Sequence, residues 1–423
     1  MKTAEDFINA INNKNITIGV VGMGYVGLPL ALEFCSKDHH VLGFDIDEEK
    51  VRALNAGQSF ISHIPAENIA RFVDKSLLDV TSDYSRIKET DAVLICVPTP
   101  LTEHREPDLS YIIATGESIA PYLHTGQLIS LESTTYPGTT EEVLIPLLER
   151  ISGLKAGTDF WMAFSPERED PNNPNFNTAR IPKVVGGFSE DCRRTAVALY
   201  DEIVVKTVPV SSCDTAEATK LLENIFRSIN IALVNELKMI FHRMGIDVWE
   251  VINAAATKPF GFMPFYPGPG LGGHCIPIDP FYLSWKAREF GVNTRFIELA
   301  GEINNMMPEY VVLRAMEELN LQGKPLKGCK LLLVGLAYKS NVNDMRESPS
   351  LRLIELFEER GAEVHYHDTY IPVVPKTREH LQLAGRKSVN LDHPEEYDLA
   401  VIATRHDNDN LSALAEKCPL IID

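Results

Sequence analysis

The stretch Gly22-Met-Gly24-Tyr-Val-Gly27 directly follows an apolar run from Ile16 to Val21. The residues after it repeat apolar side chains at the spacing of a helix. A strand, a glycine turn and a helix in this order indicate a dinucleotide site, because the glycines let the backbone approach a pyrophosphate at the helix N-terminus. We therefore expect Gly22, Gly24 and Gly27 to bind a cofactor.

A second predicted strand, His40 to Phe44, ends at Asp45. A carboxylate at this place bonds the adenosine ribose and repels a 2′-phosphate, so NAD is favoured over NADP, although the nearby Lys50 weakens that preference. Further apolar runs at 92–97, 128–131 and 161–164 alternate with helical stretches. Residues 1–208 are therefore predicted to form an NAD-binding, doubly wound α/β domain with a parallel sheet.

One long helix is predicted from Asp214 to Met244, where apolar residues recur at spacings of three and four. Asp214 and Glu217 fit a capping box at its start, and Gly245 fits its end. A helix of this length can connect two domains and still offer a flank for dimerisation. Residues 209–322 are therefore expected to form a central helical domain.

A second α/β unit begins at the apolar run 331–335. Ser348 and Pro349 fit the N-cap and first position of a helix that ends before Gly361, and further strands are predicted at 363–368 and 399–404. Residues 323–423 are therefore expected to form a C-terminal domain. The predicted fold is α/β, with two Rossmann-like parallel-sheet domains joined by a long helix and a helical domain.

Composition limits which classes of binding partner and which cellular compartment are expected. The net charge of −19 over 423 residues argues against nucleic acid and anionic membrane surfaces, which require an excess of Lys and Arg. No apolar run reaches the roughly 20 residues of a membrane span, and the N-terminus lacks a signal peptide, so a cytoplasmic protein is expected. The seven cysteines form no CxxC pair, which argues against zinc and disulfides; no metal is predicted.

The most informative segment for chemistry is Gly268-Pro-Gly-Leu-Gly-Gly-His274-Cys275-Ile-Pro-Ile-Asp279. A glycine-rich loop lets backbone amides surround a bound group and presents the Cys275 thiol as a nucleophile. The alternative is a buried cysteine in a turn. The loop favours catalysis.

Three further groups of polar residues are candidates for the same site. Lys220 and Asn224 stand one turn apart on the long helix. Ser165-Pro166-Glu167-Arg168 and Thr134 each follow a predicted strand, where a doubly wound sheet places its ligand crevice. The alternatives are a solvated lysine, a surface turn and a plain loop.

Taken together, these segments resemble the UDP-glucose/GDP-mannose dehydrogenase family, from Gly22 almost to the last residue. Two later motifs also occur in the order typical of the family, namely Gly335-Leu-Ala-Tyr-Lys339 and Arg346-Glu-Ser-Pro-Ser350. Details such as Lys258-Pro-Phe-Gly-Phe262 look like the branch of UDP-N-acetylglucosamine 6-dehydrogenases. His274 and Ile278 stand where UDP-glucose dehydrogenases typically carry serine and lysine, and Lys258 stands near a place where an arginine is usual.

The resemblance implies a four-electron oxidation of a sugar C6 alcohol to a carboxylate, with two NAD consumed and Cys275 forming a thiohemiacetal and then a thioester. Lys220 and Asn224 would stabilise charge on the C6 oxygen. Asp279 would orient water, Glu167 would act as base in thioester hydrolysis, and Thr134 would hold that water. The product would serve surface polysaccharide synthesis.

The resemblance also implies binding residues and partners. Cofactor contacts are expected from Gly22, Gly24, Tyr25, Val26, Gly27, Asp45, Lys50, Pro98, Thr99, Thr134 and Arg346. Substrate contacts are expected from Glu167, Arg168, Lys220, Asn224, Lys258, Tyr266, Gly270, Gly272 and Lys339. The expected partners are a UDP-sugar substrate and a second copy of the chain in a homodimer or higher homo-oligomer.

Alternative readings differ in specific features. UDP-glucose, UDP-ManNAc or UDP-GalNAc would need only a different sugar pocket. A two-electron hydroxyacid or 6-phosphogluconate-like dehydrogenase would not need Cys275 or a second α/β domain. A non-catalytic NAD-binding or nucleotide-sugar sensor would not need Lys220, Asn224, Cys275 and Asp279 together.

Overall fold

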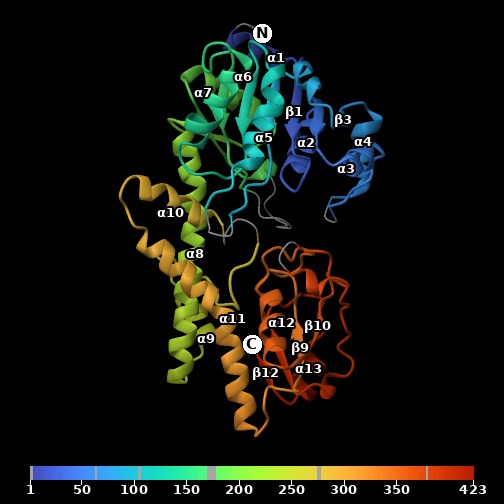
Figure 1. The fold of residues 1–423 in the computed structure, drawn as a ribbon, viewed down its shortest axis with the longest axis vertical. Helices are drawn as coiled ribbons and strands as arrows, with labels where there is room; N and C mark the ends of the chain where they lie inside the picture. Colours follow the sequence, from blue (N-terminus) through green and yellow to red (C-terminus); the bar gives the residue numbers. More distant parts are fainter. Residues whose placement is uncertain (1–2, 62–63, 103–105, 169–177, 274–277, 378–379) are drawn as a thin grey trace. The chain divides into compact units, whose positions relative to one another are not determined.

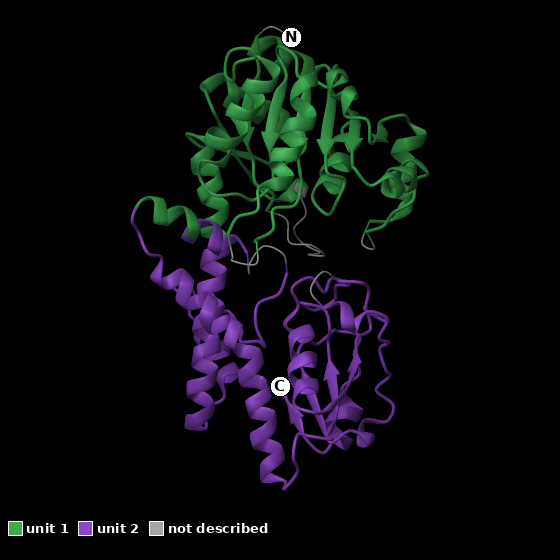
Figure 2. Ribbon diagram, viewed as in Figure 1, with its two compact units in different colours: residues 1–223, 285–290 green, residues 224–284, 291–423 purple. Residues whose placement is uncertain are grey.

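The computed structural model describes residues 3–61, 64–102, 106–168, 178–273, 278–377 and 380–423. The chain divides into two compact units, shown in two colours in Figure 2. Unit 1 comprises residues 1–223 and 285–290, and unit 2 comprises residues 224–284 and 291–423. Each unit is built on its own sheet, as the sequence predicts.

Unit 1 contains an eight-stranded sheet in the order β3-β2-β1-β4-β5-β6-β7-β8. Its strands are β1 (Thr17–Val21), β2 (His40–Phe44), β3 (Leu78–Thr81), β4 (Ala92–Ile95), β5 (Leu128–Leu131), β6 (Trp161–Phe164), β7 (Lys183–Gly187) and β8 (Thr207–Pro209). The pairs from β3 to β6 are parallel, whereas β7 runs antiparallel to β6. The strand order reverses between β1 and β4, where doubly wound sheets bind their ligands.

Apolar side chains alternate between the two faces of this sheet. One face packs against α1 (Ala4–Asn12), α2 (Gly27–Ser36), α4 (Ala66–Asp74) and α7 (Glu190–Asp201), and the other against α5 (Ser110–Ile119) and α6 (Ile145–Ser152). α3 (Glu48–Asn55) follows β2. Helices on both faces bury the central strands β1, β4, β5 and β6, which is why these strands contain continuous apolar runs.

The long helix predicted from the apolar spacing is α8 (Cys213–Met244), which is labelled in Figure 1. The residue that follows it, Gly245, has φ of +71°. The capping-box prediction is wrong. The Glu217 carboxylate accepts hydrogen bonds from the Gly138 and Thr140 amides of unit 1 instead of closing on its own helix, and the Ser212 hydroxyl accepts the Thr215 N–H. A tertiary partner has replaced the local one.

Unit 2 contains α9 (Val248–Ala256), α11 (Arg295–Leu321) and a parallel four-stranded sheet, and α10 (Asp279–Glu289) begins in it. The sheet order is β10-β9-β11-β12, with β9 (Lys330–Val334), β10 (Glu363–His367), β11 (Leu399–Ile402) and β12 (Ile421–Ile422). α11 and α12 (Pro349–Glu359) cover one face, and α13 (Ser412–Lys417) covers the other.

Local signals for the second sheet are confirmed. Ser348 is the N-cap of α12 and Pro349 its first residue, and Gly361 has φ of +85° just past its end. The strands predicted at 331–335, 363–368 and 399–404 correspond to β9, β10 and β11. Within the described ranges, none of the helices combines the length and the apolar character needed to cross a membrane.

Candidate active site

The glycine turn of unit 1 contains three glycines, of which two are in close contact with the backbone and one is not. Gly22 has φ of +92°, and a Cβ there would lie 2.7 Å from the Cys96 carbonyl oxygen. A Cβ on Gly27, the first residue of α2, would lie 2.0 Å from the Gly22 carbonyl oxygen. Gly24 has no atom within 4 Å of its Cβ position. Two glycines are thus required by the fold, and Gly24 leaves open the space a pyrophosphate needs.

Asp45 is buried directly beside this turn. Its carboxylate accepts the Met23 N–H at 3.0 Å and the Asp47 N–H at 3.0 Å, and it pairs with the Lys50 ammonium at 3.0 Å. These contacts hold the carboxylate at the end of β2, within reach of a ribose bound at the turn. The residues present therefore fit NAD.

The other predicted cofactor residues of unit 1 lie after neighbouring strands. Tyr25, which is exposed, and Val26 lie in the turn after β1. Pro98, which is exposed, and Thr99, which is buried, follow β4, the strand that pairs with β1. Thr134, half-buried, follows β5. All of them stand at the carboxyl edge of the parallel strands, on both sides of the order reversal.

Glu167 and Arg168 follow β6, and both are tied to α8. The Lys220 ammonium donates to the Glu167 carbonyl oxygen at 2.6 Å. The Arg168 guanidinium pairs with Glu223 and donates to the Pro182 carbonyl oxygen at 2.7 Å. The structure thus brings Glu167, Arg168 and Lys220 together within unit 1.

Two buried charged residues next to these, Lys183 and Glu132, were not predicted from the sequence. Lys183, the first residue of β7, donates to Glu132 at 2.7 Å and lies 3.8 Å from the Glu167 carboxylate. Burial raises the pKa of Glu132, and the neighbouring carboxylates Glu132 and Glu167 raise the pKa of Lys183 against the effect of its own burial. The available signal was a lysine and a glutamate at the ends of apolar strands, because buried charges require partners.

The segment that holds Thr134 is anchored by Glu217 of α8. Its carboxylate accepts the Gly138 N–H at 2.8 Å, the Thr140 N–H at 3.0 Å and the Thr140 hydroxyl at 2.7 Å. Burial raises the pKa of Glu217 to about 7, although these hydrogen bonds oppose the shift. The anchor connects the loop after β5 to the helix that carries Lys220.

In unit 2, the structure joins two predicted residues directly. The Asn224 amide donates to the Asp279 carboxylate, and both side chains are buried. Asp279 begins α10, four residues after Cys275 in the sequence. His274 and Cys275 themselves lie outside the described residues, so the nucleophile stays a prediction.

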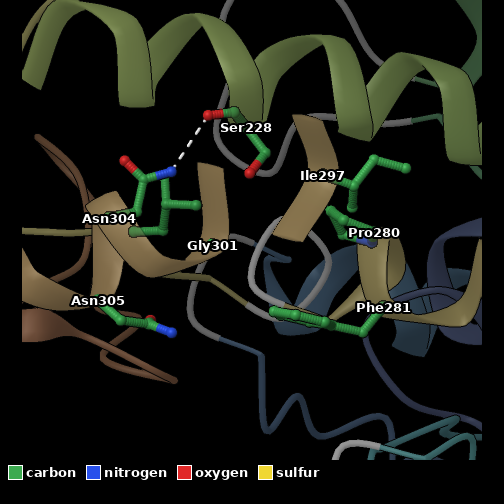
Figure 3. Close-up of a pocket in the computed structure, with 8 residues that line it drawn as sticks. Ser228, Pro280, Phe281, Ile297, Gly301, Asn304 and Asn305 are labelled. Carbon is green, nitrogen blue, oxygen red and sulfur yellow. Dashed lines mark hydrogen bonds between the residues drawn. The ribbon is translucent and has the colours of Figure 1, made fainter. Parts of the chain in front are cut away.

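The glycine-rich loop ahead of Cys275 is held by buried amides. Asn235 accepts the Gly268 N–H at 2.9 Å and donates to Asn304 at 2.9 Å. Asn304 in turn donates to the Ser228 carbonyl oxygen at 3.1 Å, in a pocket also lined by Leu271, Pro280, Phe281, Ile297, Gly301 and Asn305 (Figure 3). Asparagines 235 and 304 were not singled out from the sequence, because an amide inside a helix gives no sign of its partner.

Two glycines of this loop lie close to the segments around Tyr338 and Pro349 of the same unit. A Cβ on Gly272 would lie 2.6 Å from the Tyr338 Cβ, and one on Gly270 would lie 3.1 Å from Pro349. The Gly273 N–H donates to the Arg346 carbonyl oxygen at 3.0 Å. The segment around Arg346 therefore supports the loop that leads to Cys275.

The remaining predicted substrate residues are spread over unit 2. Lys258 is exposed, with its ammonium 5.0 Å from the Phe260 ring centroid. Tyr266 stacks on Trp249. Lys339 is half-buried in the segment after β9, and the Arg346 guanidinium pairs with Asp344 at 2.6 Å. The structure gives these residues positions but no common site.

No metal centre is found among the residues whose positions are described: no group of three or more His, Cys, Asp or Glu side chains is arranged to hold an ion. The six described cysteines are unpaired, and burial raises the pKa of Cys35 to about 12 and that of Cys329 to about 11. Such thiols stay protonated at neutral pH and are poor nucleophiles.

Comparison with known families covers the chain in three parts. Residues 16–204 match the NAD binding domain of the UDP-glucose/GDP-mannose dehydrogenase family. Residues 214–306 match its central domain, and residues 332–423 match its UDP binding domain. The cofactor of the chain is therefore NAD, as the glycine turn and Asp45 predict.

Individual relatives carry several substrate names. A UDP-N-acetyl-D-glucosamine 6-dehydrogenase from Pseudomonas aeruginosa is 36% identical over 93% of this chain and 91% of its own. An NDP-N-acetyl-D-galactosaminuronic acid dehydrogenase from Ralstonia solanacearum is 35% identical, over 87% and 86%. The solved structure of a UDP-D-ManNAc dehydrogenase from Pyrococcus horikoshii matches with a TM-score of 0.87 at 33% identity, over 96% and 95%. The chain belongs to the UDP-glucose/GDP-mannose dehydrogenase family and is an NAD-dependent nucleotide-sugar dehydrogenase.

Proposed function

We propose that the protein oxidises the C6 alcohol of UDP-N-acetylglucosamine to the carboxylate, through a covalent intermediate on Cys275, for surface polysaccharide synthesis. The observation that carries this proposal is the hydrogen bond from Asn224 to Asp279. It fixes the residue that follows the Cys275 loop to the same helix that carries Lys220. A two-electron dehydrogenase would not need a thiol in the segment before Asp279.

The reaction proceeds in three chemical stages. NAD, held at the Gly22–Gly27 turn and Asp45, would supply the hydride acceptor for each of the two oxidations. In the first, C6 loses a hydride and its hydroxyl proton and becomes an aldehyde, to which the Cys275 thiolate adds. The resulting thiohemiacetal loses a second hydride and a proton to give a thioester, and water then releases the carboxylate and restores the thiol.

Polar side chains of the chain serve these stages in different ways. Lys220 and Asn224 stabilise negative charge on the C6 oxygen. The Lys220 ammonium has three N–H donors, and one of them is hydrogen-bonded to the Glu167 carbonyl oxygen. Asp279 orients water and assists proton transfer. Glu167 removes a proton from the water that attacks the thioester, and Thr134 holds that water.

The residues proposed to contact the nucleotide sugar and NAD are those that the family resemblance implies. Glu167, Arg168, Lys258, Tyr266, Gly270, Gly272 and Lys339 contact the substrate, whereas Lys50 and Arg346 contact NAD. The pairing of Lys50 with Asp45 supports its place near the adenosine ribose. The proposed domains are 1–208 for NAD, 209–322 for the catalytic loop and dimerisation, and 323–423 for the UDP-sugar, boundaries that lie close to the three family matches.

Homodimer formation is part of the proposal. Along α8, apolar side chains are exposed at 222, 226, 233, 240 and 244, and α11 adds Phe296, Leu299, Met306 and Leu313. Apolar surface of this extent is typical of an interface between chains. Light scattering on the purified protein should give twice the mass of the chain, and a monomeric mass would contradict the proposal.

A second candidate substrate is UDP-ManNAc, favoured by the extent of the fold match to a protein of that name. The test is the number of NADH molecules formed per sugar, with UDP-GlcNAc, UDP-GalNAc, UDP-ManNAc and UDP-glucose in parallel. Two NADH per UDP-GlcNAc, with slower turnover of the others, is expected. One NADH per sugar would exclude the four-electron reaction, and faster turnover of UDP-ManNAc would move the substrate to the second candidate.

A further inference from the structure

The turn that carries Glu167 is in contact with the buried ammonium group of Lys183. The Lys183 side chain is 4% exposed, and its Nζ lies 2.7 Å from the Glu132 carboxylate, 3.3 Å from the Pro166 carbonyl oxygen and 3.8 Å from the Glu167 carboxylate. Lys183 therefore contacts the backbone of the turn and stands beside its acidic side chain at the same time.

The backbone of this turn is secured at successive positions. Lys183 donates to the Pro166 carbonyl and Lys220 donates to the Glu167 carbonyl. The link is reciprocal, because Arg168 of the turn donates to the carbonyl of Pro182, the residue before Lys183. The start of β7 and the Glu167 turn are thus held together from both sides.

Stability alone does not account for the buried pair of Lys183 and Glu132. Replacing a buried ion pair by neutral side chains of similar volume is often without cost. Glu132 also accepts the Tyr200 hydroxyl, and the Lys183 ammonium lies 5.1 Å from the Tyr200 ring centroid. This arrangement leaves the ammonium charged and in a fixed position next to Glu167.

We propose that Lys183 is a positioning residue for Glu167: it holds the Pro166–Glu167 turn and supplies a fixed positive charge beside the carboxylate that activates water. The proposal rests on the proposed function, in which Glu167 acts on the thioester. Lys183 then affects hydrolysis of the thioester and leaves both oxidations, which precede hydrolysis, largely intact.

The experiment compares three variants of the full-length enzyme. Lys183→Met alone would leave the buried Glu132 carboxyl without its ammonium partner and would risk unfolding, whereas Lys183 in Glu132→Gln still has the Glu167 carboxylate 3.8 Å away. The double variant Lys183→Met/Glu132→Gln removes both charges. Glu132→Gln alone is the matched control, since it keeps the Lys183 ammonium, and Lys183→Arg tests rescue by a residue of the same charge. Thermal melting establishes that each variant is folded.

Rapid-mixing absorbance and intact-protein mass spectrometry with UDP-GlcNAc and NAD separate oxidation from hydrolysis. We expect the double variant to form two NADH per subunit in a burst and then turn over roughly 10- to 100-fold more slowly, with an acyl adduct on the protein. Glu132→Gln alone should turn over near the wild-type rate, and Lys183→Arg should lie between the two.

Two results would overturn the role of Lys183 while the proposed function stands. One is a folded double variant with wild-type steady-state turnover, and the other is a Glu132→Gln variant that is as slow as the double variant. If the wild-type enzyme forms no NADH from any of the four UDP-sugars, the proposed function fails, and the role of Lys183 fails with it.

Discussion

The sheets of the two units contain the same strand and glycine turn, but the aspartates beside these turns have different partners. In each, a first strand ends at a glycine with positive φ, +92° at Gly22 and +89° at Gly335, and an aspartate follows the second strand, Asp45 and Asp368. In unit 1 the turn is open at Gly24. In unit 2 the corresponding aspartate, Asp368, accepts hydrogen bonds from other groups of the protein.

Asp368 has a full set of internal partners. One oxygen accepts the Leu336 and Ala337 N–H groups and the His406 ring, and the other accepts the backbone N–H groups of residues 370 and 371. These five donors exceed the roughly four lone-pair positions of a carboxylate. Although burial opposes it, hydrogen bonding lowers the pKa of Asp368, and Asp368 raises that of His406.

The same strand–turn–helix–strand arrangement thus surrounds its aspartate with different partners in the two units. The carboxylate of Asp45 is contacted by the Met23 and Asp47 N–H groups and by the Lys50 ammonium, all from the segments that follow β1 and β2. Asp368 instead stabilises the turn after β9. A nucleotide bound by unit 2 must therefore be recognised by other residues than this aspartate.

The largest difference should come from the glycines. Gly335→Ala places a Cβ 2.0 Å from the Thr404 carbonyl oxygen at positive φ, so the free energy of unfolding should fall by about 3 kcal/mol or more. Gly24→Ala meets no atom within 4 Å and should leave stability within about 1 kcal/mol. Urea unfolding of both variants checks this, and equal losses would contradict the assignment of different roles to the two turns.

The same contrast applies to NAD binding. Gly24→Ala fills the space left for the pyrophosphate and should weaken NAD about tenfold. Isothermal titration with NAD measures the change. Unaltered affinity in a folded Gly24→Ala variant would mean that the pyrophosphate does not approach this turn.

The aspartates should separate binding from stability. Asp45→Asn should weaken NAD about tenfold by removing a charged acceptor, with little loss of stability. Asp368→Asn should cost about 2 kcal/mol of unfolding free energy and leave NAD affinity unchanged, because an amide cannot accept at both positions. Titration calorimetry and urea unfolding on both variants give the answer; the reverse pattern would exchange the two roles.

A smaller effect is expected from Glu217, the buried carboxyl group that anchors the loop after β5 in unit 1. Since the pKa of Glu217 is raised from 4.5 to about 7, its contribution to stability is complete below pH 4.5 and is lost as the pH rises through about 7. Across that window the loss should be on the order of 2 kcal/mol. Glu217→Gln, which cannot ionise, should flatten the decrease in urea unfolding measured from pH 5 to 8. An unchanged slope would assign it to another group.

Local features of the fold were predictable because they depend on neighbours in sequence. The apolar runs gave the strands, the three-and-four spacing gave α8, and Ser348 gave the start of α12. The antiparallel β7 and the partner of Glu217 were not predictable, since both depend on residues far away in the chain.

The candidate site divides in the same manner. Gly22, Gly24, Gly27 and Asp45 follow from a motif whose geometry is local, and the structure places them together. The pairing of Lys183 with Glu132 joins residues 51 apart, and Asn235 meets Asn304 across 69. Only the folded chain shows which strand end faces which helix.

Trapping the covalent intermediate tests the central claim most directly. Glu167→Gln, incubated with NAD and UDP-GlcNAc and analysed by intact mass and peptide mapping, should form two NADH per subunit and carry an acyl group on Cys275, because the thioester forms but is not hydrolysed. Turnover to the carboxylate with two NADH per sugar and no adduct, or an adduct on another residue, would contradict covalent catalysis by Cys275.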